Sequence, residues 1–137
     1  MIEIILPIRL QSPNVKEHWT KTYKRNKRVA QVIGFTLWTN SEVCRLRDKL
    51  FSDTKVVKDK TKLTGGFKIR IQLIKLGRPF DYDNMVFAFK AIRDSTCAFF
   101  FPHLAAGQAD CQACFDIDYL QEKGGSGIKI LITEVPI

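Results

Sequence analysis

Alternation of apolar and polar residues marks the clearest strand of the chain. In residues 67–76, FKIRIQLIKL, the side chains of Phe67, Ile69, Ile71 and Leu73 fall on one face, and polar side chains take most of the other. A period of two is typical of a strand that packs one face against a core. We therefore expect a strand from residue 67 to residue 76.

Three further segments predict strands. Residues 2–10, IEIILPIRL, are rich in isoleucine, and Pro7 indicates an edge position or a bulge. Residues 115–121, FDIDYLQ, and residues 128–134, IKILITE, are also rich in strand-forming residues. The glycine-rich residues 123–127 between the last two predict a hairpin connection.

A helical period of three to four residues dominates two other parts of the chain. In residues 16–51 it is carried by Val29, Val32, Ile33, Leu37, Val43, Leu46 and Leu50. Gly34 and the polar residues 39–41 weaken this pattern, so one kinked helix and two consecutive helices both fit. A later helix, ending near Cys97, is predicted by Met85, Phe89, Ile92 and Thr96, which share a face.

The remaining segments carry no clear period. Residues 52–64, SDTKVVKDKTKLT, are polar and predict a loop closed by the glycines at 65–66, and residues 99–108 predict a long connection or a short hydrophobic element. The order of strands and helices predicts an α+β fold, a two-layer sandwich with a mixed or antiparallel sheet and helices on one face. A length of 137 residues predicts a single domain, residues 1–137.

Basic residues outnumber acidic ones and give a formal net charge of +8, which points to a polyanionic partner. One short segment holds a large share of this charge: Lys16, Lys21, Lys24, Arg25, Lys27 and Arg28. Trp19 and Tyr23 lie among them and offer rings for stacking on bases. The segment is either an arm that follows a phosphate backbone or a solvated helix face.

No apolar run approaches the roughly 20 residues of a membrane span, and the first residues look like a strand without a charged leader. We therefore expect a cytoplasmic protein with no membrane partner. In that compartment reduced thiols are expected. Cys97, His103, Cys111 and Cys114 form a conceivable zinc set, although their spacing fits no standard zinc motif and ordinary thiols are the alternative.

Negative charge concentrates in the DYDN sequence at residues 81–84, between the clearest strand and a helix. In extended backbone, Asp81 and Asp83 would point the same way, and a hard cation such as Mg²⁺ would make their proximity tolerable. The alternative is a helix cap, with Asp83 or Asn84 as N-cap and Asp81 near the positive end of the helix dipole. The two interpretations are compatible.

Residues 67–133, with the strand, a basic turn around Arg78, D-Y-D-N, a helix, a later aspartate and two final strands, resemble the RusA family of Holliday-junction resolvases. The N-terminus is similar as well, with Leu6-Pro7 and Ser12-Pro13-Asn14 before a basic helix. The resemblance implies a homodimeric α+β endodeoxyribonuclease that cuts four-way junction DNA with Mg²⁺, for which Mn²⁺ can substitute.

The resemblance also implies site residues. Asp81 and Asp83 match the family's first two metal-binding acids, and Asp110, in a D-C-Q sequence, matches the third, with Asp116 and Asp118 as alternatives. Arg78 and the basic arm would bind DNA. The family's best-studied branch has a lysine where this chain has Phe87.

Lys90 is the expected replacement for that lysine. It follows Asp83 by seven residues, which in a continuous helix is the same face and about 10 Å along the axis. There it would contact phosphate, and a solvated helix lysine is the alternative. Phe87 and the open choice of third acid leave a second function, a junction-binding relative that has lost activity. A third is a basic RNA-binding module whose aspartates only cap a helix.

Overall fold

The computed structural model describes residues 1–11, 18–52, 54–57, 60–63, 67–101 and 115–136. Along the chain these residues form β1 (Ile2–Leu6), α1 (Trp19–Trp38), α2 (Ser41–Ser52), β2 (Thr54–Val57), β3 (Lys60–Leu63), β4 (Phe67–Leu76), α3 (Tyr82–Ala88), α4 (Lys90–Phe100), β5 (Phe115–Glu122) and β6 (Ile128–Pro136). Strand β4 has the bounds that its alternating pattern predicts.

The main sheet has four strands in the order β1-β6-β4-β5. Strand β4 pairs in parallel with β5 and antiparallel with β6, and β6 pairs antiparallel with β1. The predicted hairpin between the last two strands is therefore wrong. The glycine-rich residues 123–127 carry the chain past β4, which lies between β5 and β6 and hydrogen-bonds to both.

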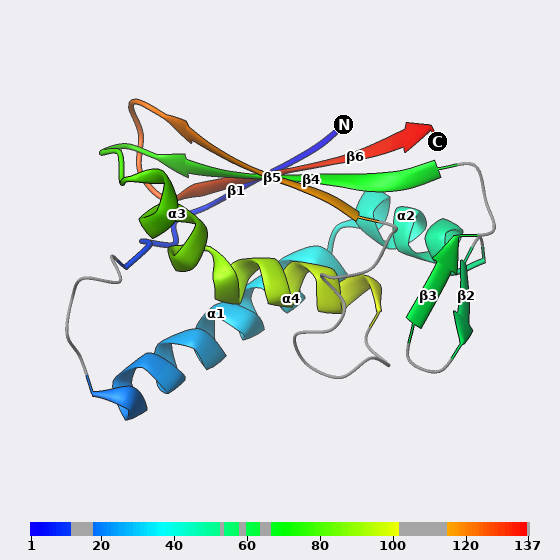
Figure 1. Cartoon of the computed structure of the whole chain (residues 1–137), viewed down its shortest axis with the longest axis horizontal. Helices are drawn as coiled ribbons and strands as arrows, with labels where there is room; N and C mark the ends of the chain where they lie inside the picture. Colours follow the sequence, from blue (N-terminus) through cyan, green and yellow to red (C-terminus); the bar gives the residue numbers. More distant parts are fainter. Residues whose placement is uncertain (12–17, 53, 58–59, 64–66, 102–114, 137) are drawn as a thin grey trace.

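Helices cover one face of this sheet, and Figure 1 shows them together below the strands. The inner side chains of β4, from Phe67 to Leu73, pack with those of β6 and with Ile33, Leu37, Phe89 and Ile92 of the helices into one hydrophobic core. Burying these apolar surfaces supplies the main driving force for the fold. The prediction of an α+β two-layer architecture is confirmed.

The basic and amphipathic parts of residues 16–51 form two helices within the described residues. α1 ends at Trp38, and the Asn40 side-chain oxygen accepts a hydrogen bond of 3.0 Å from the Val43 amide, which caps the start of α2. The predicted loop at residues 52–64 is wrong in part, because β2 and β3 form an antiparallel pair there. The polar sequence has no alternating pattern that would predict β2 and β3, and main-chain pairing joins these two strands.

Candidate metal centre and nucleic-acid surface

The D-Y-D-N sequence lies where the chain leaves the sheet and enters the helix layer. Asp81 is the N-cap of α3, with extended backbone angles (φ −59°, ψ 148°), and its carbonyl accepts a hydrogen bond of 2.9 Å from the Met85 amide. Its carboxylate makes no capping hydrogen bond. The predicted cap at Asp83 or Asn84 is wrong, since helical geometry already begins at Tyr82.

The carboxylates of Asp81 and Asp83 are exposed, and no described residue neutralises them. Asp83 stands in the first turn of α3, so only Asp81 is extended and strand alternation does not set their relative direction. Neither side chain has an ion pair or hydrogen bond with another residue that the structure describes. Such carboxylate oxygens suit a hard cation.

Three residues are candidates for the third acid of the metal site. Asp110, the first choice, lies outside the described residues, and among those described no group of three or more His, Cys, Asp or Glu side chains could hold a metal ion. Asp116 and Asp118 lie on β5, as the sequence predicts, and alternate with the core-packed Phe115, Ile117 and Tyr119. They therefore face away from the helix layer.

Lys90 is exposed, but the helix between it and Asp83 is not continuous. α3 ends at Ala88, and Phe89 (φ −81°, ψ −4°) is both the C-cap of α3 and the N-cap of α4, which Lys90 begins. The chain changes direction at this point in Figure 1. Lys90 would share a face with Asp83 only in one straight helix, which the structure does not have, so the role of this lysine stays a prediction.

An inward-facing side chain of β5 also fixes the main chain of the acidic turn, the segment that carries Asp81 and Asp83. Gln121 accepts a hydrogen bond from the Phe80 amide (2.7 Å) and donates one to the Phe80 carbonyl (2.8 Å). Its amide thus holds the main chain immediately before Asp81. Gln121 is not among the site residues predicted from the sequence, where its only signal is a polar residue at an inward position of a predicted strand.

Tyr119, one inward position earlier on β5, connects the same region to the helices. Its hydroxyl accepts a hydrogen bond of 2.8 Å from Arg93 of α4, and its ring lies 6.5 Å from the ring of Tyr82, edge to face. It also lies 6.1 Å from the ring of Phe89. Aromatic contacts of this kind add roughly 0.5–1.5 kcal/mol each beyond buried area, so Tyr119 helps to fix the bend between α3 and α4.

The basic arm coincides with the first half of α1. Lys21, Lys24, Lys27 and Arg28 are exposed and Arg25 is half-buried, and Lys16 lies outside the described residues. Trp19 and Tyr23 expose 72% and 62% of their surfaces, so both rings are open to a partner. The buried residues of α1, Ile33 and Leu37, belong to its second half, and the first half extends beyond the sheet at the lower left of Figure 1.

The zinc prediction falls mostly outside the described residues. Cys97 is fully buried in the hydrophobic core, while His103, Cys111 and Cys114 lie in residues 102–114, which are not described. A core position is what an ordinary thiol favours. None of the helices in the described residues is both long enough and apolar enough to cross a membrane.

Searches of protein-family models, curated proteins and solved structures found no significant match to this chain.

Proposed function

We propose that this chain is a Mg²⁺-dependent endodeoxyribonuclease that resolves four-way DNA junctions. The observation that carries the proposal is the pair of exposed carboxylates at the turn between β4 and α3, which no described residue neutralises, in a chain whose net charge is +8. Carboxylate oxygens that make no ion pair with the described residues remain available to a hard cation, which prefers oxygen ligands.

Asp81 and Asp83 would hold the metal, and Asp110 would complete the set. Two or three carboxylates suffice, because Mg²⁺ fills the rest of its shell with water and phosphate oxygens. An ion held by these acids would supply Lewis-acid chemistry, polarising a phosphate and lowering the pKa of a bound water. The role of Gln121 is to keep Asp81 in place by holding the Phe80 main chain.

The basic half of α1 would bind the backbone of the junction arms. Its lysines and arginines displace counterions from DNA, so binding should weaken steeply as salt rises. Lys90 would contact the phosphate being cut and offset its charge. A homodimer would present two such sites, which matches paired cuts in a two-fold symmetric junction.

Cleavage of a fluorescently labelled four-way junction in Mg²⁺ tests the proposal. We expect the parent chain to release nicked duplexes and Asp81→Asn to release none while it still binds the junction. Arg45→Ala, at an exposed position on α2, is the matched control and should cut at the parent rate. Equal cutting by the parent and Asp81→Asn would contradict the proposal.

Phe87 gives one specific reason to weigh a relative that binds junctions without cutting them. It occupies the position of the family lysine and exposes 65% of its surface. In that case the parent chain would bind the junction tightly and leave it intact in both Mg²⁺ and Mn²⁺. A preference for RNA over junction DNA, with no thermal shift in divalent metal, would instead indicate an RNA-binding module.

A further inference from the structure

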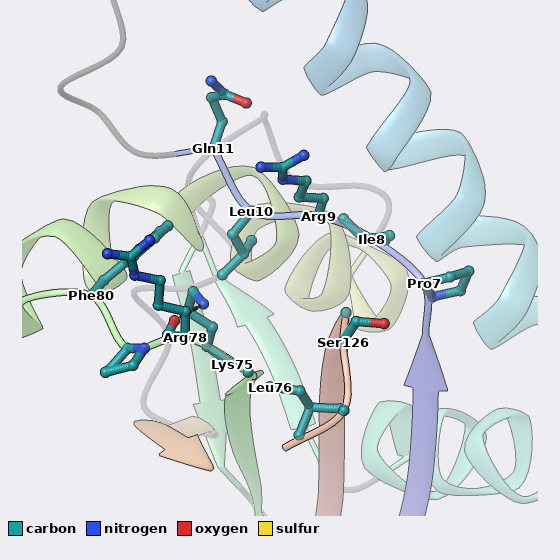
Figure 2. Close-up of a pocket in the computed structure, with 14 residues that line it drawn as sticks. Pro7, Ile8, Arg9, Leu10, Gln11, Lys75, Leu76, Arg78, Phe80 and Ser126 are labelled. Atoms are coloured by element: carbon teal, nitrogen blue, oxygen red, sulfur yellow. Dashed lines mark hydrogen bonds between the residues drawn. The ribbon is translucent and has the colours of Figure 1, made fainter. Parts of the chain in front are cut away.

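A cavity of about 740 Å³ opens at the end of the sheet from which the D-Y-D-N sequence departs. Three segments line it: residues 7–11 after β1, residues 75–80 at the end of β4, and residues 125–127 before β6. Figure 2 shows Lys75, Arg78 and Phe80 on one of these segments and Arg9 on another. The volume is within the range of about 300–1,000 Å³ that ligand pockets occupy.

Close main-chain contacts build the floor of this cavity. The Leu76 amide donates to the Gly127 carbonyl (3.1 Å), and the Gly77 amide donates to the Glu122 carbonyl (3.0 Å). Gly127 has φ +91°, and a Cβ there would lie 2.3 Å from the Leu6 carbonyl oxygen. Only glycine allows this approach, so the three lining segments are fixed against one another.

The charges around the cavity are all positive among its described lining residues. Arg9 and Arg78 are exposed at its edge, Lys75 is buried, and the described lining includes neither Asp nor Glu. Figure 2 shows that the two arginines approach from different segments of the chain. Three cations with no carboxylate among them create a local potential that favours an anion.

Lys75 differs from the two arginines because its side chain is buried. It exposes only 8% of its surface, its ammonium donates a hydrogen bond to the Arg78 carbonyl, and it lies 4.4 Å from the centre of the Phe80 ring. Burial lowers the pKa of Lys75 below its ordinary value. A buried ammonium costs stability when, as here among the described residues, no acid pairs with it, and an anionic ligand would offset that cost.

We propose that this cavity binds a backbone phosphate of the nucleic acid, one adjacent to the phosphate that Asp81 and Asp83 address. The inference rests on the proposed function for the identity of the polymer. An arginine guanidinium can donate two parallel hydrogen bonds to phosphate oxygens. Lys75 adds a third positive charge to the lining of the cavity. Phe80 lines the cavity and immediately precedes Asp81, so a phosphate here lies beside the acidic turn.

The salt dependence of junction binding measures this contact. Without divalent metal, we expect Arg9→Ala to bind a fluorescein-labelled four-way junction roughly tenfold more weakly than the parent. We also expect the slope of log K against log salt to become less steep by about 1. Arg45→Ala, which removes an exposed arginine outside the cavity, is the control. Its slope should stay closer to that of the parent than the slope of Arg9→Ala does. Parent values in both Arg9→Ala and Lys75→Met would overturn the proposal.

Inorganic phosphate tests the cavity without DNA. At constant ionic strength, sodium phosphate in place of chloride should raise the Tm of the parent and of Arg45→Ala, and should raise that of Lys75→Met far less. Methionine keeps the length of the lysine stem and removes the charge. Melting of Lys75→Met in a single cooperative step shows that it is folded, and the exposed Arg9→Ala serves as a second variant.

The two tests separate the cavity from the nuclease. If the parent does not cut junctions but the cavity variants flatten the salt slope, the phosphate site stands and the nuclease proposal fails. If phosphate raises the Tm but the cavity variants bind the junction like the parent, the cavity takes free phosphate and the inference to nucleic acid is overturned.

Discussion

Three acids on the exposed face of the sheet, Asp116, Glu122 and Glu3, differ from the two at the turn after β4. On the sheet, Asp116 pairs with Lys68 at 2.9 Å, and Lys129 reaches both Glu122 at 3.2 Å and Glu3 at 3.5 Å. Asp81 and Asp83 have no such partner among the described residues. Asp116, Glu122 and Glu3 balance neighbouring lysines, whereas no described residue neutralises the two turn acids.

The largest expected difference is between a turn acid and a sheet acid when each is replaced by asparagine. Asp83→Asn should slow junction cleavage at least about 100-fold, because a metal contributes several kcal/mol to the transition state and each 1.36 kcal/mol is tenfold. Asp116→Asn should cut at close to the parent rate and lose at most about 1 kcal/mol of stability. Single-turnover cleavage and urea unfolding give both numbers. Equal rates for the two variants would remove the distinction.

Removing the anchor of the turn should cost both stability and activity. Gln121→Leu leaves the Phe80 amide and carbonyl without their partner, and we expect a loss of about 1–3 kcal/mol in the free energy of unfolding. Cleavage should fall as well, because Asp81 is then less well positioned. Gln72→Leu, a half-buried glutamine on the neighbouring strand, is the control. Unchanged stability of Gln121→Leu would show that the two hydrogen bonds contribute little.

Divalent metal should stabilise only chains that keep the turn acids. At tenfold excess over its Kd, Mn²⁺ should add about 1.4 kcal/mol to the stability of the parent, a rise of a few degrees in Tm. Asp116→Asn should respond like the parent, and Asp81→Asn should not respond. Calorimetry with Mn²⁺, and with Ca²⁺ as a second oxygen-preferring ion, measures the shift. A full response in Asp81→Asn would place the ion elsewhere.

The smallest predicted effect on stability concerns Lys129, which pairs with acids on the exposed face of the sheet. The hydrogen bond to Glu122, helped by the charges of Glu122 and Glu3, raises the pKa of Lys129 above its ordinary value of 10.5. The stabilisation is therefore complete below pH 10.5 and is lost as pH rises through the folded-state pKa. Between pH 9 and 11.5 the Tm of the parent should fall slightly more than that of Lys129→Met, and parallel curves would count against the pair.

Local pattern was enough to predict the elements that pack against the core. The alternation in β4 and the helical face of Met85, Phe89, Ile92 and Thr96 both correspond to buried side chains. These periods arise directly from burial on one side. The break between α3 and α4 could not be predicted in the same way, since neither proline nor glycine marks Phe89 and both helices bury the same face.

Pairing between distant strands was the harder part of the fold. The glycines at 124, 125 and 127 suggest a hairpin, and only the placement of β4 between β5 and β6 prevents it. The same holds for the site, because Asp81 and Asp83 are visible in the sequence while the contact between Gln121 and Phe80 joins residues 41 positions apart. The cavity likewise needs three segments that only the folded sheet assembles.

The hydrogen bonds of Gln121 have a mechanical consequence. They tie the main chain before α3 to β5, an edge strand of the sheet, so the D-Y-D-N sequence is connected to the strand layer by direct hydrogen bonds. If α1 shifts when the proposed nuclease binds DNA, the acids would keep their position against the sheet. Binding and cleavage would then tolerate different amounts of movement within one small chain.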